Sequence, residues 1–323
     1  MFRNYMLIAV RNLRRHPGYS LINIFGLAIS MACCMLLVLY MRHELSYDRF
    51  HSKSEQIYRL VGDRFAPTPA PWAPVLARDF PEVMQAVRIK TPFNRWYVSA
   101  GETGFWEKGF YFADEGFFEV FDFPLTQGDP NTALSAPGSV VISETAARRY
   151  FGSEEPIGKA ILVENRFDLT VVGVMRDMPD NSHFRCDLLT SFKTLETDHS
   201  WYGNITDFAT QGFNLHVYTY LLMQEGYEAA GFSDKIPAFL ETYLGENAKA
   251  GLLSQTFRLQ PITDIYLHST LEAEIGVTSD IVYVYILGTL AFFVILLACI
   301  NFMNLATARA ATRAKEVGMR KVV

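Results

Sequence analysis

Two long stretches without a charged residue constrain this chain more than any other feature. Leu21–Met41 spans 21 residues and Ile281–Ala308 spans 28. A helix over the first stretch would be about 31 Å long at 1.5 Å per residue, close to the roughly 30 Å hydrocarbon core of a bilayer. The second stretch is longer than a crossing needs, so its helix should tilt or extend beyond the bilayer. The sequence therefore predicts transmembrane helices over residues 21–41 and 281–308.

The alternatives are a cleaved signal peptide for the first stretch and a buried core helix for the second. The apolar part of a signal peptide is usually about 7–15 residues long and is followed by small residues at the cleavage site. Here the longer stretch is followed by RHELSYDRF. An uncharged run as long as the second stretch is unusual for a core helix. Transmembrane helices are the better interpretation of both.

Charge around the two stretches predicts their orientation. Residues 1–20 carry four arginines and no acidic residue, and residues 309–323 carry five basic residues against one acidic residue. Basic flanks remain on the cytoplasmic side of a membrane, so both termini should be cytoplasmic and residues 42–280 should lie outside. Residues 1–20 also place arginines opposite apolar side chains on a helical wheel. They should form an amphipathic surface helix against anionic lipid.

The segment between the two stretches has the pattern of a folded α+β domain. Half of the chain is hydrophobic and only 20% is charged, which excludes a disordered protein. Alternating or β-branched residues predict strands at 56–61, 139–143, 167–175 and 215–223. Ser143 and Gly152 should bound one helix, and Ser233 and Gly245 a second. Residues 190–214 lack a clear period and form either a small inserted lobe or a long loop.

Few residues point to catalysis or ligand binding. The segment 152–160 (GSEEPIGKA) resembles a P-loop, but it has five residues between its glycines and an alanine where Mg²⁺ would require Ser or Thr. His183 and Cys186, beside Asp187, supply too few soft ligands for a zinc site, which favours an ordinary polar loop. A net charge of −5 argues against nucleic-acid binding, and four cysteines exclude a disulfide-rich scaffold. We expect no catalytic residue, metal or cofactor in this chain.

Small and polar residues predict where the two membrane helices are in contact with protein. Gly26 and Ser30 are four residues apart and would allow close approach of a neighbouring helix. Asn301 and Asn304 share one face of the second helix, and an asparagine buried in lipid needs a partner. The alternative is that both asparagines lie in the wet interface near the basic residues.

Several segments, in this order, resemble the first half of an ABC transporter permease of the MacB/FtsX type. The opening RNYMLIAVRNLRRHPGYSLINIFGLAIS and the following ELSYDRFHSKSEQIYRL are two of them. The others are FFEVFDFPLTQGDP, SVVISETAARRYFG, EEPIGK, VVGVMRDMPDNSHF and the closing CINFMNLATARAATRAKEVGMRKVV. The resemblance implies a bacterial inner-membrane protein whose two transmembrane helices flank a bilobed α+β periplasmic domain over residues 42–280.

The same resemblance implies a non-catalytic permease subunit. A separate cytoplasmic ABC ATPase would bind ATP and Mg²⁺, and the membrane helices would transmit its motion outward for export or envelope work. Residues 309–323 would begin the coupling region, which places Arg313, Glu316, Gly318 and Arg320 near the ATPase. The other implied partners are a second permease unit or permease dimer, and a periplasmic or outer-membrane export protein. Family members continue beyond this point with further membrane helices, so the chain is expected to be truncated.

Two other functions fit the same arrangement. A membrane sensor or receptor can also hold a ligand-binding domain between two helices, and it would require a signalling module. A scaffold that regulates cell-envelope enzymes is the third possibility, because some proteins of this type have that role.

Overall fold

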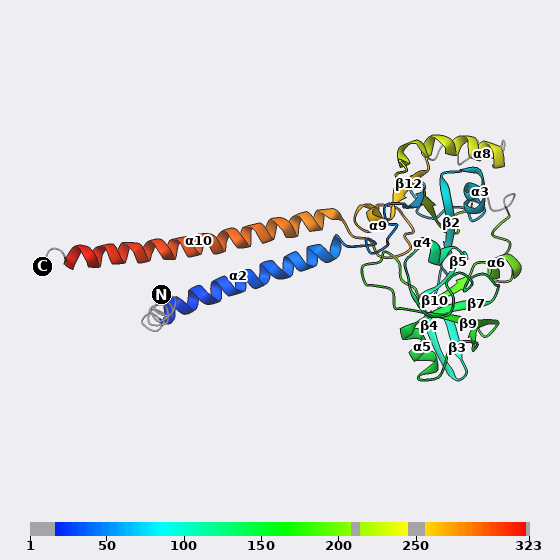
Figure 1. Cartoon of the computed structure of the whole chain (residues 1–323), viewed down its shortest axis with the longest axis horizontal. Helices are drawn as coiled ribbons and strands as arrows, with labels where there is room; N and C mark the ends of the chain where they lie inside the picture. Colours follow the sequence, from blue (N-terminus) through cyan, green and yellow to red (C-terminus); the bar gives the residue numbers. More distant parts are fainter. Residues whose placement is uncertain (1–16, 208–213, 245–255, 321–323) are drawn as a thin grey trace. The chain divides into compact units, whose positions relative to one another are not determined.

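The computed structural model describes residues 17–207, 214–244 and 256–320 (Figure 1). The chain divides into two compact units. Met1–Leu45 and Asp280–Val323 form the first, and Ser46–Ser279 form the second, which we call the sheet domain. Residues 1–16, where we expect most of the amphipathic surface helix, lie outside the described residues.

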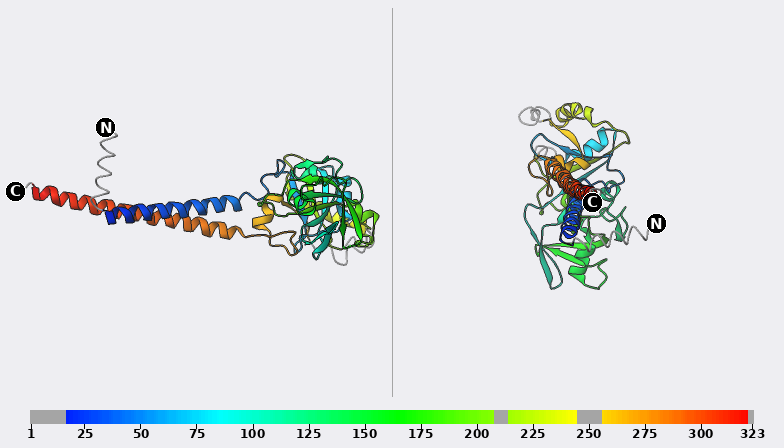
Figure 2. Two further views of the ribbon diagram at one scale, coloured as in Figure 1. Left: turned by 90° about the horizontal axis from the view of Figure 1, so that it is seen from below. Right: turned by 90° about the vertical axis from the view of Figure 1, so that its left-hand side faces the viewer.

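The first unit contains two long helices, α2 (Pro17–Glu44) and α10 (Ile281–Arg320), which lie side by side (Figures 1 and 2). Ile24–Glu44 and Ile281–Asn304 are each long and apolar enough to cross a membrane. Large apolar side chains point away from the neighbouring helix; Leu36 is 66% and Leu297 65% exposed. Exposed apolar surface of this extent is typical of membrane-spanning helices. The expected fold class, two apolar helices flanking an α+β domain, is confirmed.

The sheet domain is built on one twelve-stranded mixed sheet. From one edge to the other the order is β12 (Arg258–Pro261), β1 (Ile57–Val61), β11 (Tyr218–Met223), β2 (Val83–Lys90), β5 (Phe110–Ala113), β10 (Leu188–Ser191), β7 (Ser139–Ser143), β9 (Phe167–Met175), β8 (Ala160–Val163), β3 (Trp96–Ala100) and β4 (Thr103–Glu107), with β6 (Leu125–Gln127) paired to β9. The pairs β5–β10 and β7–β9 are parallel, and the other pairs are antiparallel.

Short helices cover this sheet at several places. They are α3 (Trp72–Asp79), α4 (Phe117–Val120), α5 (Glu144–Phe151), α6 (Lys193–Thr197), α8 (Ile236–Leu244), α9 (Ile262–His268) and the 3-10 turns η1 (Ala229–Gly231) and η2 (Ser233–Lys235). Figure 1 shows α3 and α8 at the β12 end of the sheet and α5 near β3 and β4 at the other end.

Three clusters of buried side chains hold the domain together. Trp72, Phe239 and Phe257 are the aromatic centre of the cluster at the β12 end. A second cluster lies under α5 and the strands β7 to β9. A third, rich in phenylalanine, packs α4 and the loops around residue 184 against β11. The two end clusters correspond to two lobes that share one continuous sheet.

Several local predictions are confirmed. The strands β7 and β9 have the expected bounds, and β11 begins three residues later than expected. The Ser143 hydroxyl accepts a hydrogen bond from the Ala146 amide as the N-cap of α5, and Gly152 follows the helix with a φ of 62°. Ser143 is also the last residue of β7, so this hydroxyl joins a strand to a helix without a loop. The segment after β10 contains α6 and is followed by turns.

Candidate functional site

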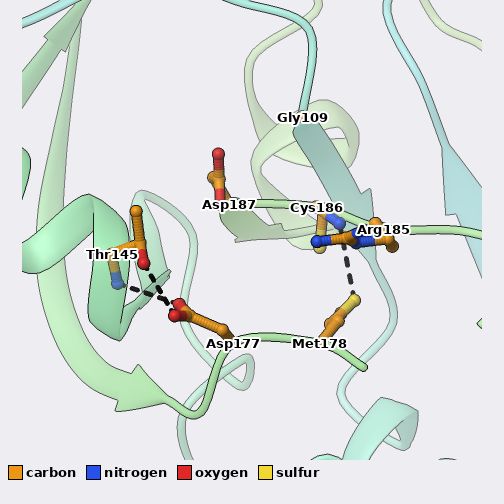
Figure 3. A pocket seen from close by; sticks show the side chains of 7 residues that line it. All are labelled: Gly109, Thr145, Asp177, Met178, Arg185, Cys186 and Asp187. Carbon is orange, nitrogen blue, oxygen red and sulfur yellow. Dashed lines mark hydrogen bonds between the residues drawn. The ribbon is translucent and has the colours of Figure 1, made fainter. Parts of the chain in front are cut away.

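A polar cleft of about 380 Å³ lies beside the start of α5 (Figure 3). Asp177 accepts hydrogen bonds from the amide and the hydroxyl of Thr145, at 2.9 and 2.6 Å. The Met178 sulfur accepts a bond from the Cys186 amide at 3.4 Å. Burial raises the pKa of the Cys186 thiol well above its usual value, so it stays protonated. The polar groups of the cleft therefore form hydrogen bonds with one another, and these bonds stabilise the turn that contains Asp177 and Met178.

A second cavity, of about 620 Å³, is lined by residues 49–52, 54–56 and 225–227. Its buried member is His51, whose Nδ1 accepts a hydrogen bond from the Asp122 amide at 3.1 Å. The Nε2 atom of His51 has no hydrogen-bond partner among the described residues. Burial lowers the pKa of His51 to about 4, so the ring is neutral at pH 7.

Beside this cavity a buried network of hydrogen bonds begins at Asp48, which lies four residues beyond the end of α2. Asp48 is fully buried with a φ of 57°. Its Oδ1 accepts a hydrogen bond from the His183 amide at 3.1 Å and lies 2.8 Å from His183 Nδ1. On the other side of the ring, His183 Nε2 is 2.7 Å from the Tyr220 hydroxyl on β11. Burial raises the pKa of Tyr220 far above its usual value, so the phenol remains protonated.

A second buried network of hydrogen bonds begins at Glu274, seven residues before α10. Both Glu274 oxygens accept hydrogen bonds from the Arg59 guanidinium on β1, at 2.5 and 2.8 Å. Arg59 also donates to Gln260 on β12 at 2.8 Å. Burial alone would lower the pKa of Arg59, but the interactions with Glu274 and Tyr220 together outweigh it and the pKa is raised. The ion pair lies inside the domain, with side-chain exposures of 0% for Arg59 and 9% for Glu274.

Three further contacts join the segments beside these two networks. A side chain on Gly276 would come within 2.1 Å of the His183 carbonyl oxygen, so the segment before α10 packs on the residue that binds Asp48. Tyr47 stacks on Tyr266 of α9 with ring centroids 3.3 Å apart. The carbonyl of the same Tyr266 accepts a hydrogen bond from the Ser279 amide at 2.8 Å. We call this assembly the linker clamp; it consists of Tyr47, Asp48, Arg59, His183, Tyr220, Tyr266, Glu274, Gly276 and Ser279.

Sequence reasoning missed the linker clamp. It treated His183 as part of an ordinary polar loop, but the structure places the ring in the core with only 2% of the residue exposed. Asn181 in the same loop binds Ser46 through two hydrogen bonds, at 3.0 and 2.9 Å. The loop therefore holds the chain where it leaves α2. The available signal was that two of the segments resembling the family, around residues 44–60 and 171–184, are rich in polar residues without forming a ligand motif.

The residues expected to pack the membrane helices lie on α2 and α10. A Cβ atom built on Gly26 would lie 3.7 Å from the Asn301 side-chain nitrogen. The Ser30 hydroxyl donates to the Gly26 carbonyl at 2.8 Å, within its own helix. Further along the same contact, Cys34 approaches the carbonyl of Ala291 at 3.9 Å. Asn304 is exposed.

Arg313, Glu316, Gly318 and Arg320 lie in the last turns of α10, in a part of that helix whose side chains are not described. Within the described ranges, no group of three or more His, Cys, Asp or Glu side chains is arranged to hold a metal ion.

Comparison with known proteins gives the family. The model of the MacB-like periplasmic core domain matches residues 20–238. Among curated proteins, no sequence matches the chain.

Three solved structures are similar to this chain at low sequence identity. A domain of a protein described as a permease from Porphyromonas gingivalis is 17% identical with a TM-score of 0.54; the match covers 65% of this chain and 92% of that domain. The periplasmic region of MacB from Actinobacillus actinomycetemcomitans is 14% identical with a TM-score of 0.47, over 66% of this chain and 91% of that one. The extracellular domain of the noncanonic ABC-type transporter YknZ from Gram-positive bacteria is 15% identical with a TM-score of 0.42, over 63% and 99%.

The family match covers more than half of the chain, and it includes most of α2 and most of the sheet domain. Because it also agrees with the mixed α/β fold and the two apolar helices, this chain belongs to the MacB-like periplasmic core domain family of ABC-type permeases.

Proposed function

We propose that the chain is a permease subunit of an ABC transporter that passes the ATP-driven motion of a separate cytoplasmic ATPase to the sheet domain. In this proposal it lies in the bacterial inner membrane with the outer ends of α2 and α10 facing the periplasm. The linker clamp is the observation that carries the proposal. It ties the segment leaving α2 and the segment leading to α10 to the same core.

The physical argument concerns stiffness. Removing one partner of a buried ion pair typically costs about 3–5 kcal/mol, because the other charge is left without compensation in the interior. Arg59 and Glu274 form such a pair, and Arg59 lies on the strand next to Tyr220. A displacement of either linker is therefore resisted by β1 and β11 and is passed into the sheet.

The length of α10 supports the cytoplasmic half of the proposal. A helix of 40 residues is about 60 Å long, roughly twice the hydrocarbon core of a bilayer. Its helical conformation continues through residues 313–320, the expected coupling region. These residues would contact the ATPase, where ATP and Mg²⁺ are bound; a second permease unit and an export partner would complete the assembly.

The experiment uses the chain tagged in its native membrane and purified in a mild detergent. We expect an ABC ATPase subunit to be recovered with it and to hydrolyse ATP. The double variant Glu316→Ala/Arg320→Ala should lose most of that ATPase or its activity. As a matched control, Arg64→Ala removes a charge from the surface of the sheet domain and should change neither. Recovery of a signalling kinase or an envelope hydrolase in place of an ATPase would overturn the proposal.

Transmission is tested separately in the same complex. Phe93 is 83% exposed on the sheet domain, so Phe93→Cys can carry a spin label without entering the core. We expect ATP with Mg²⁺ to change the label's spectrum, and Glu274→Gln to reduce that change while ATP hydrolysis persists. A label that is insensitive to ATP in a complex that hydrolyses it would refute the mechanical role.

A further inference from the structure

The strand β4 forms one edge of the twelve-stranded sheet, and among the strands that the structure describes it pairs only with β3. Phe105 and Trp106 on this strand are 39% and 62% exposed. Edge strands that carry apolar side chains tend to pair with another chain unless Pro, a bulge or a covering element blocks them. The opposite edge strand, β12, ends in Pro261, which has no N–H to offer. Among the described residues, β4 contains no proline and pairs with β3 without a bulge.

The hydrogen-bonding direction of each β4 residue follows from the hairpin. A two-residue turn at Gly101–Glu102 makes Ala100 and Thr103 the closing hydrogen-bonded pair. Alternation then directs the backbone groups of Phe105 toward β3, and those of Gly104 and Trp106 outward. The backbone of β3 follows the same alternation. The carbonyl of Tyr97, which lies opposite Trp106, points away from β4 and accepts a hydrogen bond from the Glu164 amide at 2.7 Å.

We propose that β4 pairs antiparallel with β4 of a second copy of this chain, with Phe105 opposite Phe105 on a two-fold axis. In that register Gly104 faces Trp106 of the other copy, and each pair exchanges the outward N–H and C=O groups that the hairpin leaves free. Interfaces of this kind bring the same patch of both copies together. The two sheets then continue into one another.

Charge complementarity selects the second copy as the occupant and fixes the register. Glu102 lies in the turn just before β4 and Lys108 directly follows β4. In the Phe105-centred register, Glu102 of each copy therefore comes near Lys108 of the other at the two ends of the paired strands. Both residues are exposed, and neither has an ion-pair partner in the described part of the chain. Opposite charges attract each other when the paired strands bring them close together. A shift by two residues in either direction keeps the backbone parity but loses both charge pairs.

Disulfide trapping in native membranes tests the register. Phe105→Cys is made in the full chain with Cys33, Cys34 and Cys299 replaced by Ser; buried Cys186 is retained. A non-hydrogen-bonded pair brings the two Cα atoms about 4.5 Å apart, within disulfide range. Thr103→Cys is the matched control on the same strand and face, because its counterpart lies four residues away, about 13 Å along the strand. We expect at least tenfold more covalent homodimer for position 105.

Equal trapping at both positions, or none at position 105, would overturn the proposal. So would cross-linking of position 105 to a protein of a different mass, which would indicate a foreign strand as the occupant. Tryptophan fluorescence of the reduced variants verifies that the domain is folded.

Charge reversal provides a second test that leaves the core untouched. Glu102→Lys places two lysines near each other in both halves of the interface, and Lys108→Glu places two glutamates there. We expect either single change to lower trapping at position 105 several-fold, and the double change to restore it. Failure of the double change to restore trapping, or no effect of the single changes, would overturn the register.

Discussion

Neutralising Glu274 is the most direct test of the linker clamp. Its two oxygens accept hydrogen bonds from the two terminal nitrogens of Arg59, at 2.5 and 2.8 Å, and the Ser269 hydroxyl also donates a hydrogen bond to it. In Glu274→Gln the side chain keeps its size, but its amide group faces a fully buried guanidinium. We expect a loss of about 3–5 kcal/mol in the free energy of unfolding of the sheet domain, the usual range for removing one partner of a buried pair.

The matched control is Glu272→Gln, two residues away. Glu272 pairs with Arg64, but their side chains are 53% and 71% exposed, so this pair should contribute only about 0–1 kcal/mol. Urea unfolding of the purified full chain, followed by tryptophan fluorescence, measures both. The signal reports the sheet domain alone, because it contains every tryptophan of the chain: Trp72, Trp96, Trp106 and Trp201. Losses that agree within about 1 kcal/mol for the two variants would refute the reasoning.

Three further predictions follow from the same structure. The pKa of His51 falls from 6.5 to about 4 on folding, so the unfolded chain gains a proton first as the pH falls. The wild type should therefore lose about 2 kcal/mol of stability between pH 7.5 and 5 that His51→Asn does not lose. Equal pH dependence of the two proteins in urea unfolding would contradict this. Gly276→Ala should destabilise the domain by about 1–3 kcal/mol or more, since its Cβ would collide with backbone at 2.1 Å, whereas Gly231→Ala, which meets nothing within 4 Å, should change stability by less than about 1 kcal/mol. Ala291→Cys should form a disulfide with Cys34 under mild oxidation, because the two helices are in contact there, and a gel that shows no such cross-link would exclude this packing of α2 against α10.

Local structure was predictable where neighbouring residues determine it. Ser143 and Gly152 bound α5 through an N-cap hydroxyl and a positive φ, and both effects operate within a few residues. The apolar segments of α2 and α10 were predictable for the same reason, since the absence of charge over a bilayer's thickness is a local property.

The linker clamp was not predictable, because burial of charge depends on partners that are distant in the sequence. Arg59 and Glu274 are 215 residues apart, and each alone has the composition of a solvated surface residue. His183 likewise has the usual features of a loop histidine until β11 supplies the Tyr220 hydroxyl. The order of the strands was also beyond reach, because β2 pairs with β11 and β5 rather than with its neighbours in the chain.

The stacking of Tyr47 on Tyr266 and the hydrogen bond from Ser279 to the same residue restrict the conformational freedom of the segments that follow α2 and precede α10. Asn181 also binds Ser46, so only Leu45 lies between the end of α2 and the first bound residue, and only Asp280 lies between Ser279 and α10. Any hinge must therefore use the few backbone torsions of Leu45 and Asp280. A glycine inserted beside Asp280 would lengthen one linker without changing a residue of the sheet domain or of the helices. It would separate the effect of linker flexibility from that of the contacts themselves.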